Sequence, residues 1–304
     1  MTDGNSLSLE SLLCCPYCKN SLTKLKLSLY CQKCNLKFII DDGIFFFNIK
    51  TQERESSKFK KDLIEKMKNI NVNANPTISQ QIDTKEISKA TGLLKGKIIL
   101  DAGCGTGLST LGLLDKGAFI VFMDLIPESL RIVQKIVKLK NKKDNILYIV
   151  GDITNLPLKD RCIDIIWSGG VLEHFKSFKE QYIEFFRVLK NKGNLIFTIP
   201  NKFGFQRIYS TIKEKLIGSI DDHYETGFHY YHLKQLFPKN FFSTYKIKTI
   251  GIEQTYYEGI LPILHLNLPS IAFLFYKYTI LLLSKLFSPV KFGSSWFLLH
   301  GVKK

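Results

Sequence analysis

Residues 98–107 have the sequence IILDAGCGTG, and this stretch decides the fold. An apolar run is followed by Gly103, Gly105 and Gly107, after which a helical pattern begins at Leu108. Glycine in such a turn lets the backbone approach a ligand at positions where any Cβ would clash. A glycine-rich turn between a strand and a helix is typical of folds that bind nucleotides and related cofactors. The segment therefore predicts a strand–turn–helix unit with a ligand at the turn.

Apolar runs and helical patterns alternate along the chain on both sides of this turn. The expected strands, rich in Ile, Val and Phe, are Lys97–Gly103, Ala118–Asp124, Ile146–Asp152, Cys162–Gly169 and Asn194–Pro200. The expected helices are Leu108–Lys116, Pro127–Leu139 and Lys176–Leu189. Alternation of this kind predicts a parallel sheet that is covered by helices on both faces.

Polar residues stand at the ends of the expected strands. Asp124 ends the second strand, where a carboxylate accepts hydrogen bonds from ribose hydroxyls. Asp152 ends the third strand and is placed to meet the exocyclic amine of an adenine, and Ser168 ends the fourth. Because the carboxyl ends of parallel strands meet at one edge of a sheet, we expect these side chains and the glycine turn to form a single site.

The glycine turn by itself is compatible with a nicotinamide cofactor as well as with S-adenosylmethionine. Five segments narrow this choice, namely Leu100–Gly107, Phe122–Asp124, Gly151–Ile153 with Leu156-Pro157, Val171–Phe175 and Arg187–Leu195. In these segments the chain from Leu93 to about Pro200 resembles a class I methyltransferase of the group that contains quinone-biosynthesis and small-molecule enzymes. The resemblance favours S-adenosylmethionine over NAD.

The resemblance implies a doubly wound, mostly parallel α/β sheet of seven strands, Rossmann-like, with the seventh strand antiparallel. Thr244–Glu253 and Ser295–Val302 fit the sixth and seventh strands. It also implies S-adenosylmethionine as the cofactor. The residues expected to bind it are Asp101, Gly103, Gly105, Gly107, Asp124, Leu125, Asp152, Ile153 and Ser168.

Two CxxC pairs precede this domain and predict a metal site. They consist of Cys15, Cys18, Cys31 and Cys34, with alternating leucines between the pairs that favour a hairpin. Two such knuckles on a hairpin bring four thiolates into the tetrahedron that Zn²⁺ accepts in closed structural sites. The alternatives are a redox pair or unmetallated thiols. The segment resembles the small zinc ribbon that precedes some methyltransferases, including certain RNA-modifying ones.

We therefore expect three regions. Residues 1–48 form a zinc-ribbon-like module, and residues 49–96 form a linker with N-terminal helices. Residues 97–304 form the methyltransferase domain, which contains a lid at about 202–240 and an apolar helical insertion at about 257–290.

Histidines supply the candidates for catalysis. His174 follows the fourth strand, and His223 and His229 lie in the expected lid among tyrosines and carboxylates. Methyl transfer from a sulfonium needs a base only if the nucleophile carries a proton, so these residues are candidates for substrate contact or proton removal. In some relatives a Glu-x-x-Glu-His segment binds Mg²⁺, but Gly170 occupies the first glutamate position here, which disfavours that metal site.

The sequence leaves two classes of methyl acceptor open. The apolar insertion favours O- or C-methylation of a small or lipid-linked acceptor, with peripheral membrane contact through residues 260–287. The ribbon and a formal net charge of +16 favour an RNA or protein substrate, although no aromatic–basic nucleic-acid motif is present. A pseudo-enzyme scaffold is the third alternative. Residues 1–13 lack the pattern of a secretory signal, so we expect a cytoplasmic protein, with the membrane periphery as the alternative.

Overall fold

The computed structural model describes residues 9–47, 70–73, 75–142, 145–175, 177–202, 230–238, 240–250 and 296–304, together with residues 64–65, 67, 204, 228, 278–279 and 282. Most of the expected lid and of the apolar insertion lies outside these residues, as do His223 and His229. Within the described ranges, no helix is long and apolar enough to cross a membrane.

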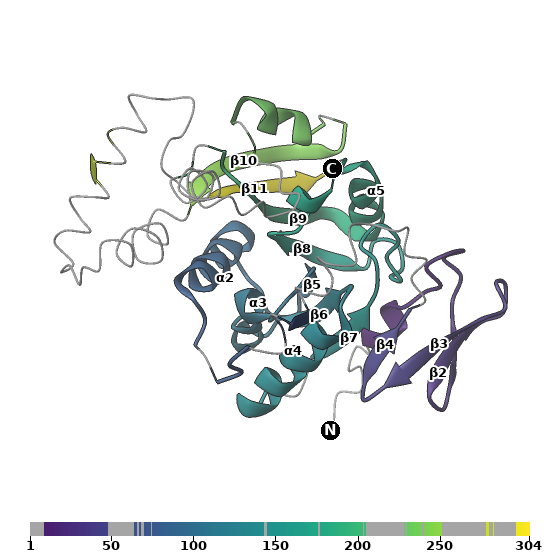
Figure 1. The fold of residues 1–304 in the computed structure, drawn as a ribbon. Coiled ribbons are helices and arrows are strands. Elements are labelled where there is room, and N and C mark those ends of the chain that lie inside the picture. Colours follow the sequence, from purple (N-terminus) through teal and green to yellow (C-terminus); the bar gives the residue numbers. More distant parts are fainter. Residues whose placement is uncertain are drawn as a thin grey trace, which may run out of the picture.

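A single mixed sheet runs through the described part of the chain (Figure 1). Its strand order is β1-β2-β3-β4-β7-β6-β5-β8-β9-β11-β10. The strands are β1 (Thr23–Leu25), β2 (Ser28–Cys31), β3 (Leu36–Asp41), β4 (Ile44–Phe46), β5 (Ile98–Ala102), β6 (Phe119–Asp124), β7 (Ile146–Val150), β8 (Ile163–Gly169), β9 (Leu189–Pro200), β10 (Phe242–Ile250) and β11 (Trp296–Lys303).

The centre of the sheet is parallel, as the alternating pattern predicts. Leu100 of β5 pairs with Val121 of β6 on one side and with Ile166 of β8 on the other. Every residue of β5 is buried. Strands covered on both faces need such continuous apolar runs, which is why these segments show no polar alternation. The predicted α/β fold is confirmed.

The two C-terminal strands complete the sheet in the expected way. Leu299 of β11 pairs antiparallel with Phe197 of β9 and with Ile247 of β10. The strand β11 therefore lies between β9 and β10, and its antiparallel direction is the one that the resemblance implied for the seventh strand.

Strand β9 begins earlier than the pattern indicates. It starts at Leu189 instead of Asn194, and Leu189 pairs with Ile163 at the start of β8. The register shifts between Ile163 and Ile165, and Lys192 has φ 61°. The polar segment before Asn194, which lies between the expected helix and the expected strand, is thus an irregular part of the strand itself.

Helices cover both faces of the parallel strands (Figure 1). Side chains of α2, α3 and α4 share one apolar core with the sheet, whereas side chains of α5 and of the N-terminal module share the other. The α-helices are α2 (Ile78–Thr91), α3 (Leu108–Leu111), α4 (Pro127–Leu139) and α5 (Lys179–Val188), and the 3₁₀ turns are η1 (Leu9–Leu12), η2 (Leu114–Lys116), η3 (Leu172–His174) and η4 (Tyr230–Leu236).

The helix expected at Leu108–Lys116 is interrupted. It is divided into α3 and the 3₁₀ turn η2, with Gly112 at the C-cap of α3. Glycine costs about 1 kcal/mol relative to alanine in a helix interior, so the helix is weakest at this position. In contrast, α4 has the predicted bounds, with Pro127 in its first turn.

The N-terminal module is part of the same sheet, which was not expected. Strand β4 pairs in parallel with β7, with Phe45 opposite Ile149. The backbone N–H of Phe47 continues the ladder by donating to the carbonyl O of Val150 at 3.1 Å. Seven strands of the methyltransferase domain and four of the module therefore form one sheet of eleven strands. The strand count predicted from the resemblance holds only for the domain.

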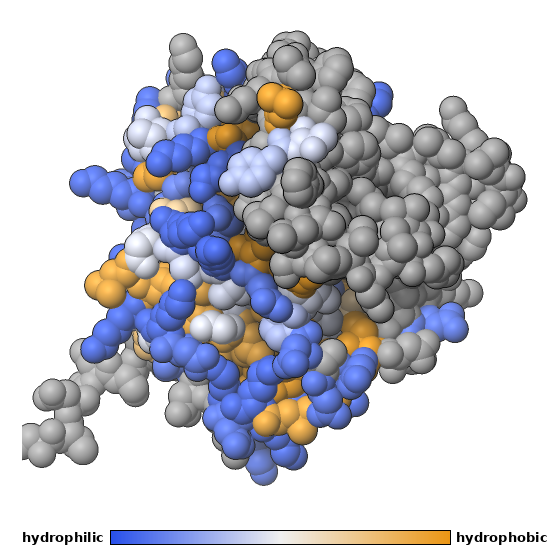
Figure 2. Space-filling model, turned by 90° about the vertical axis from the view of Figure 1, so that its left-hand side faces the viewer, coloured by the Kyte–Doolittle hydropathy of each residue, from blue (hydrophilic) through white to orange (hydrophobic). Residues whose placement is uncertain are grey.

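Figure 2 shows the side of the molecule that lies on the left in Figure 1. Its described residues are mainly hydrophilic, with small hydrophobic patches between them. Single apolar side chains such as Leu93 and Leu139 are exposed, which is normal for a protein surface.

Candidate functional site

The glycine turn is built on close backbone approaches. The N–H groups of Gly103 and Cys104 both donate to the carbonyl O of Met123, at 2.8 and 3.0 Å, and so fasten the end of β5 to the end of β6. Gly103 has φ 81°, and a Cβ placed there would lie 2.4 Å from Val171 Cγ2. Only glycine fits such a position, because the conformation and the space both exclude a side chain.

Gly105 differs from the other glycines of the turn, since open space surrounds its missing side chain. Its φ is 52°, and a Cβ built on it would meet no described atom within 4 Å. Gly107, by comparison, packs so closely that a Cβ would lie 2.8 Å from Phe122 Cε1. Packing within the described residues therefore explains glycine at Gly103 and Gly107. At Gly105 the structure offers a cradle that a ligand would fill.

Asp124 joins this cradle to the next strand. Its Oδ2 accepts a hydrogen bond from the Gly105 N–H at 2.9 Å, and its Oδ1 accepts one from the Ile126 N–H at 2.9 Å. Burial raises the pKa of Asp124, and the N–H donors of Ile126 and Gly105 oppose that shift. The carboxylate is thus fixed beside the cradle, and the neighbouring Leu125 is 40% exposed. Together they form a surface suited to a ribose.

Asp152 lies where the third parallel strand ends, at the same edge. Its Oδ1 accepts hydrogen bonds from the backbone N–H and the hydroxyl of Thr154, both at 2.8 Å. The neighbouring Ile153 is 7% exposed and belongs to the core on the α5 side. Hydrogen bonds to Oδ1 set the orientation of the Asp152 carboxylate at the sheet edge.

The side chains of Asp101 and Ser168 support the site from inside. The Asp101 carboxylate is 2% exposed and accepts a hydrogen bond from the Thr110 hydroxyl at 2.5 Å. Burial raises the pKa of Asp101 to about 7. The Ser168 hydroxyl is fully buried and donates to the carbonyl O of Ala102 at 3.0 Å. These side chains hold the ends of β5 and β8 in place, and their expected contact with a cofactor stays a prediction.

His174 ends the 3₁₀ turn that follows β8. Glu173 is 1% exposed, and His174 is partly buried. Gly170 has φ 69°, and a Cβ there would lie 3.7 Å from Glu173 Oε1. The turn therefore packs its glutamate inward behind Gly170, and His174 is the described histidine nearest in sequence to the fourth strand end. Its catalytic role, like those of His223 and His229, stays a prediction.

Helix α2 contributes residues that the sequence motifs did not indicate. Gln80 donates from Nε2 to the Thr106 hydroxyl at 3.1 Å, which fastens α2 to the glycine turn. Asp83 accepts a hydrogen bond from the Ser109 hydroxyl at 2.8 Å, and burial raises the pKa of Asp83 to about 6. The signal in the sequence was weak, because an aspartate in a mainly polar helix carries no motif. These residues belong to the segment that was expected to be a linker with helices, yet Gln80 contacts the glycine turn and Asp83 lines a cavity beside it.

A cavity of about 120 Å³ opens beside this helix. It lies at the carboxyl ends of β8 and β9 and beside the start of β11. Its lining residues are Ser79, Ile82, Asp83, Gly169, Gly170, Thr198, Ile250 and Trp296.

The four cysteines of the N-terminal module come together as predicted. The Sγ atoms of Cys15, Cys18, Cys31 and Cys34 all lie within 4.8 Å of one another. The Sγ distances are 3.8 Å between Cys15 and Cys34 and 3.4 Å between Cys18 and Cys31. Zn–S bonds of about 2.3 Å in a tetrahedron place sulfurs about 3.8 Å apart, so the cluster fits a structural Zn²⁺.

Cys14 lies outside this cluster. Its backbone N–H donates to the carbonyl O of Pro157 at 3.0 Å, and burial raises the pKa of its thiol to about 11. Burial also raises the pKa of the Cys15 thiol, so position rather than acidity separates the two cysteines. The four-cysteine cluster therefore contains Cys15 and not Cys14.

The module also contacts the segment that follows Asp152. Lys19 donates from Nζ to Asn155 Oδ1 at 2.8 Å and forms an ion pair with Glu184 at 2.9 Å. The backbone N–H of Lys159 donates to the carbonyl O of Leu12 at 2.8 Å. The metal module and the edge of the cofactor site are therefore connected directly.

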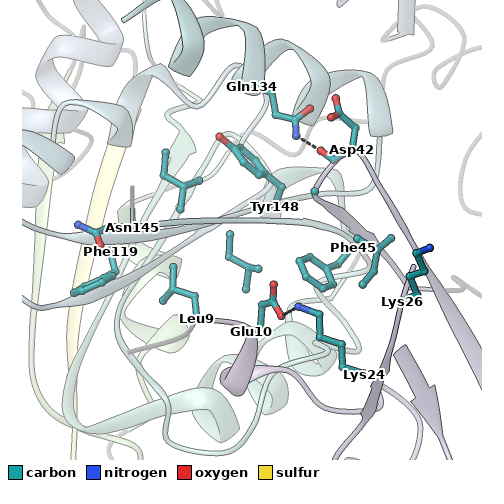
Figure 3. Close-up of a pocket in the computed structure, with 14 residues that line it drawn as sticks. Leu9, Glu10, Lys24, Lys26, Asp42, Phe45, Phe119, Gln134, Asn145 and Tyr148 are labelled. Carbon is teal, nitrogen blue, oxygen red and sulfur yellow. Dashed lines mark hydrogen bonds and ion pairs between the residues drawn. The ribbon is translucent and has the colours of Figure 1, made fainter. Parts of the chain in front are cut away.

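A larger cavity of about 600 Å³ lies between the module and the domain (Figure 3). Lys24 and Glu10 form an ion pair at its rim, and Gln134 donates from Nε2 to the carbonyl O of Asp42 at 2.7 Å. Phe119 and Ile146, which begin β6 and β7, also line it. This cavity is therefore at the opposite edge of the sheet from Asp124 and does not belong to the cofactor site.

Comparisons with known proteins agree with this architecture. Residues 100–197 match the family described as a methyltransferase domain, and residues 7–43 match the family of Trm112p-like proteins. The malonyl-[acyl-carrier protein] O-methyltransferase of Hamiltonella defensa subsp. Acyrthosiphon pisum is 33% identical over 108 residues, 36% of this chain and 40% of that protein. The demethylmenaquinone methyltransferase of Renibacterium salmoninarum is 29% identical over 134 residues, 43% of this chain and 54% of that protein.

A solved structure shows the same fold. The phosphoethanolamine N-methyltransferase 2 of Haemonchus contortus, in complex with phosphomonomethylethanolamine and S-adenosylhomocysteine, has a TM-score of 0.53 at 16% identity. The alignment covers 81% of this chain and 57% of that one.

Fold, site and comparisons define the class of protein: the chain carries a class I methyltransferase domain with a Rossmann-like sheet. Its N-terminal module is Trm112p-like and has a four-cysteine cluster. The chain spans only 40% and 54% of the length of the two curated relatives described above.

Proposed function

We propose that this protein is an S-adenosylmethionine-dependent methyltransferase that acts on an O or C atom of a small or lipid-like acceptor. The observation that carries the proposal is the open cradle at Gly105 next to the fixed carboxylate of Asp124. In this proposal the donor is held by Gly103, Gly105, Gly107, Asp124, Leu125, Asp152 and Ile153. When bound, it supplies an electrophilic methyl group, so the protein has mainly to align the acceptor.

The acceptor class rests on the relatives. The two curated relatives are named for methylating an acyl-carrier-protein-linked malonyl group and a quinone. Both are small or lipid-like acceptors, which supports the same class here. His174 stands beside the site as a candidate for substrate contact. The proposed location is cytoplasmic, with the membrane periphery as the alternative.

The second candidate function is an RNA or protein methyltransferase. The Trm112p-like match and the net charge of +16 favour it. The two candidate functions are distinguished by the fraction of a lysate that the protein methylates. Total RNA and protein are compared with lipid and small-molecule extracts. Transfer of a labelled methyl group to the macromolecular fractions alone would select the second candidate.

Binding of the methyl donor tests the proposal directly. Calorimetry is expected to show a single site for S-adenosylmethionine and for S-adenosylhomocysteine, and no binding of NAD. Binding of NAD without binding of S-adenosylmethionine would reject the proposal.

Gly105→Ala is expected to weaken S-adenosylmethionine binding at least about tenfold, because the new methyl group occupies the cradle. Gly92→Ala is the matched control. Gly92 also has a positive φ, 69°, and open space around its missing side chain, but it caps the far end of α2. Both variants carry the backbone strain, so equal donor affinities in calorimetry would show that the cradle at Gly105 does not hold the donor.

A further inference from the structure

The cavity beside α2 lies next to the proposed donor site along the sheet edge. The strand order β7-β6-β5-β8-β9-β11 places Asp152, Asp124 and the glycine turn on one half of that edge. The cavity lies over the other half, where Gly170, Thr198 and Trp296 line it. A group bound in the cavity would therefore lie beside the donor and separate from its ribose end.

The cavity combines a proton acceptor with a proton donor. Asp83 lines it and is held by the Ser109 hydroxyl at 2.8 Å. Trp296 lines it as well, and its buried indole Nε1–H has no hydrogen-bond partner in the described part of the chain. A buried N–H without a partner is unfavourable, and a ligand oxygen that accepts its hydrogen bond would remove that cost.

The charge of the lining residues indicates the kind of ligand. Asp83 is an acid, and neither Lys nor Arg is among the described residues that line the cavity. A carboxylate ligand would meet Asp83 without a counter-charge, and a buried like-charge pair is costly. A hydroxyl group suits both partners, since it donates one hydrogen bond and accepts another.

We propose that this cavity receives a hydroxyl group of the methyl acceptor, with Asp83 as the base and the Trp296 indole N–H bound to the hydroxyl oxygen. The proposal rests on the proposed function. The new carbon–oxygen bond forms as the carbon–sulfur bond of the donor breaks, and that electron pair stays on sulfur. The hydroxyl proton passes to the Asp83 carboxylate, so the step needs no further reactant.

The electrostatic surroundings of Asp83 suit this role. Burial raises its pKa to about 6, and the hydrogen bond from Ser109 lowers it. The carboxylate of Asp101 on β5 interacts electrostatically with Asp83, and Glu86 on the same helix as Asp83 forms an ion pair with Lys248 of β10. Asp83 is therefore ionised above about pH 6, and activity is expected to fall as the pH drops through that value.

Phenol and benzoate are the probes for the cavity, and Trp296 is a built-in reporter. The chain has only two tryptophans, and the fluorescence of the Trp296→Phe variant is that of Trp167 alone. In the presence of S-adenosylhomocysteine, phenol is expected to change Trp296 fluorescence at concentrations at least tenfold lower than benzoate does. Equal response to both probes, or no response to either, would overturn the proposal.

Asp83→Asn tests the base. Methyl transfer to phenol is expected to fall about a hundredfold or more, the usual contribution of a positioned base, while calorimetry shows unchanged donor binding. If the wild-type protein does not bind the donor, the proposed function itself is rejected. Ser109→Ala removes a hydrogen bond that lowers the pKa of Asp83, so the acidic limb of the rate profile should shift upward. An Asp83→Asn variant that methylates phenol at the wild-type rate, or a Ser109→Ala profile that does not move, would contradict the role of Asp83.

Discussion

Asp124→Ala is expected to weaken the binding of S-adenosylmethionine about a hundredfold or more. Hydrogen bonds from hydroxyls to a carboxylate contribute about 1.5–3 kcal/mol each, so losing two from a ribose costs at least about 3 kcal/mol. The variant also removes the acceptor of the Gly105 and Ile126 N–H groups, which loosens the cradle. Calorimetry measures the change in affinity.

Asp115→Ala is the matched control for this prediction. Asp115 is an exposed aspartate on η2 that pairs with Lys142, away from the sheet edge. Its donor affinity should stay at the wild-type value. Circular dichroism should show a folded Asp124→Ala protein, because burial raises the pKa of Asp124 and makes its charge costly to the fold. Wild-type affinity in a folded Asp124→Ala variant would mean that the ribose does not bind this carboxylate.

Cys15→Ser is expected to remove the metal and to lower the thermal stability of the entire chain. The wild-type protein should contain about one Zn²⁺, as a closed four-thiolate site requires, and the variant close to none. Structural zinc contributes about 10–16 kcal/mol to the folding of small zinc modules, so the N-terminal strands should unfold without it. Because β4 pairs with β7, hydrogen exchange should become faster at Ile146–Val150 as well.

Cys14→Ala supplies the control for the metal. Cys14 is as buried as Cys15 but lies outside the cluster, so the variant should keep its zinc and lose only packing. Elemental analysis measures the zinc content, and a thermal melt measures the stability. If Cys15→Ser keeps a full complement of zinc, or if metal-free protein melts at the wild-type temperature, the cluster does not support the fold.

The local features of the fold could be predicted from the sequence. Helix α4 has the predicted bounds because Pro127 favours the first turn of a helix and an amphipathic pattern continues from it to Leu139. The four-cysteine cluster follows from ligand spacing alone. The glycine turn could be predicted because no larger residue fits at Gly103 and Gly107, and this requirement appears in the sequence as a glycine pattern.

Long-range contacts and side-chain directions could not be predicted in the same way. Nothing in Ile44–Phe46 indicates which strand it will pair with, so the module was expected to be separate from the sheet. A strand presents alternate faces, so the sequence could not indicate that the Ser168 hydroxyl donates to Ala102, and its contact with a cofactor stays a prediction. Asp83 was missed because its neighbour Ser109 lies on another helix, 26 positions away.

The β4–β7 ladder also covers what would otherwise be a free edge of the parallel strands. Without β4, the apolar strand Ile146–Val150 would present a row of unsatisfied backbone groups at the margin of the sheet. Such margins recruit strands from other molecules and lead to aggregation. We therefore expect the N-terminal module to protect against self-association. A fragment that begins after residue 48 is expected to precipitate even if every residue of the donor site is present.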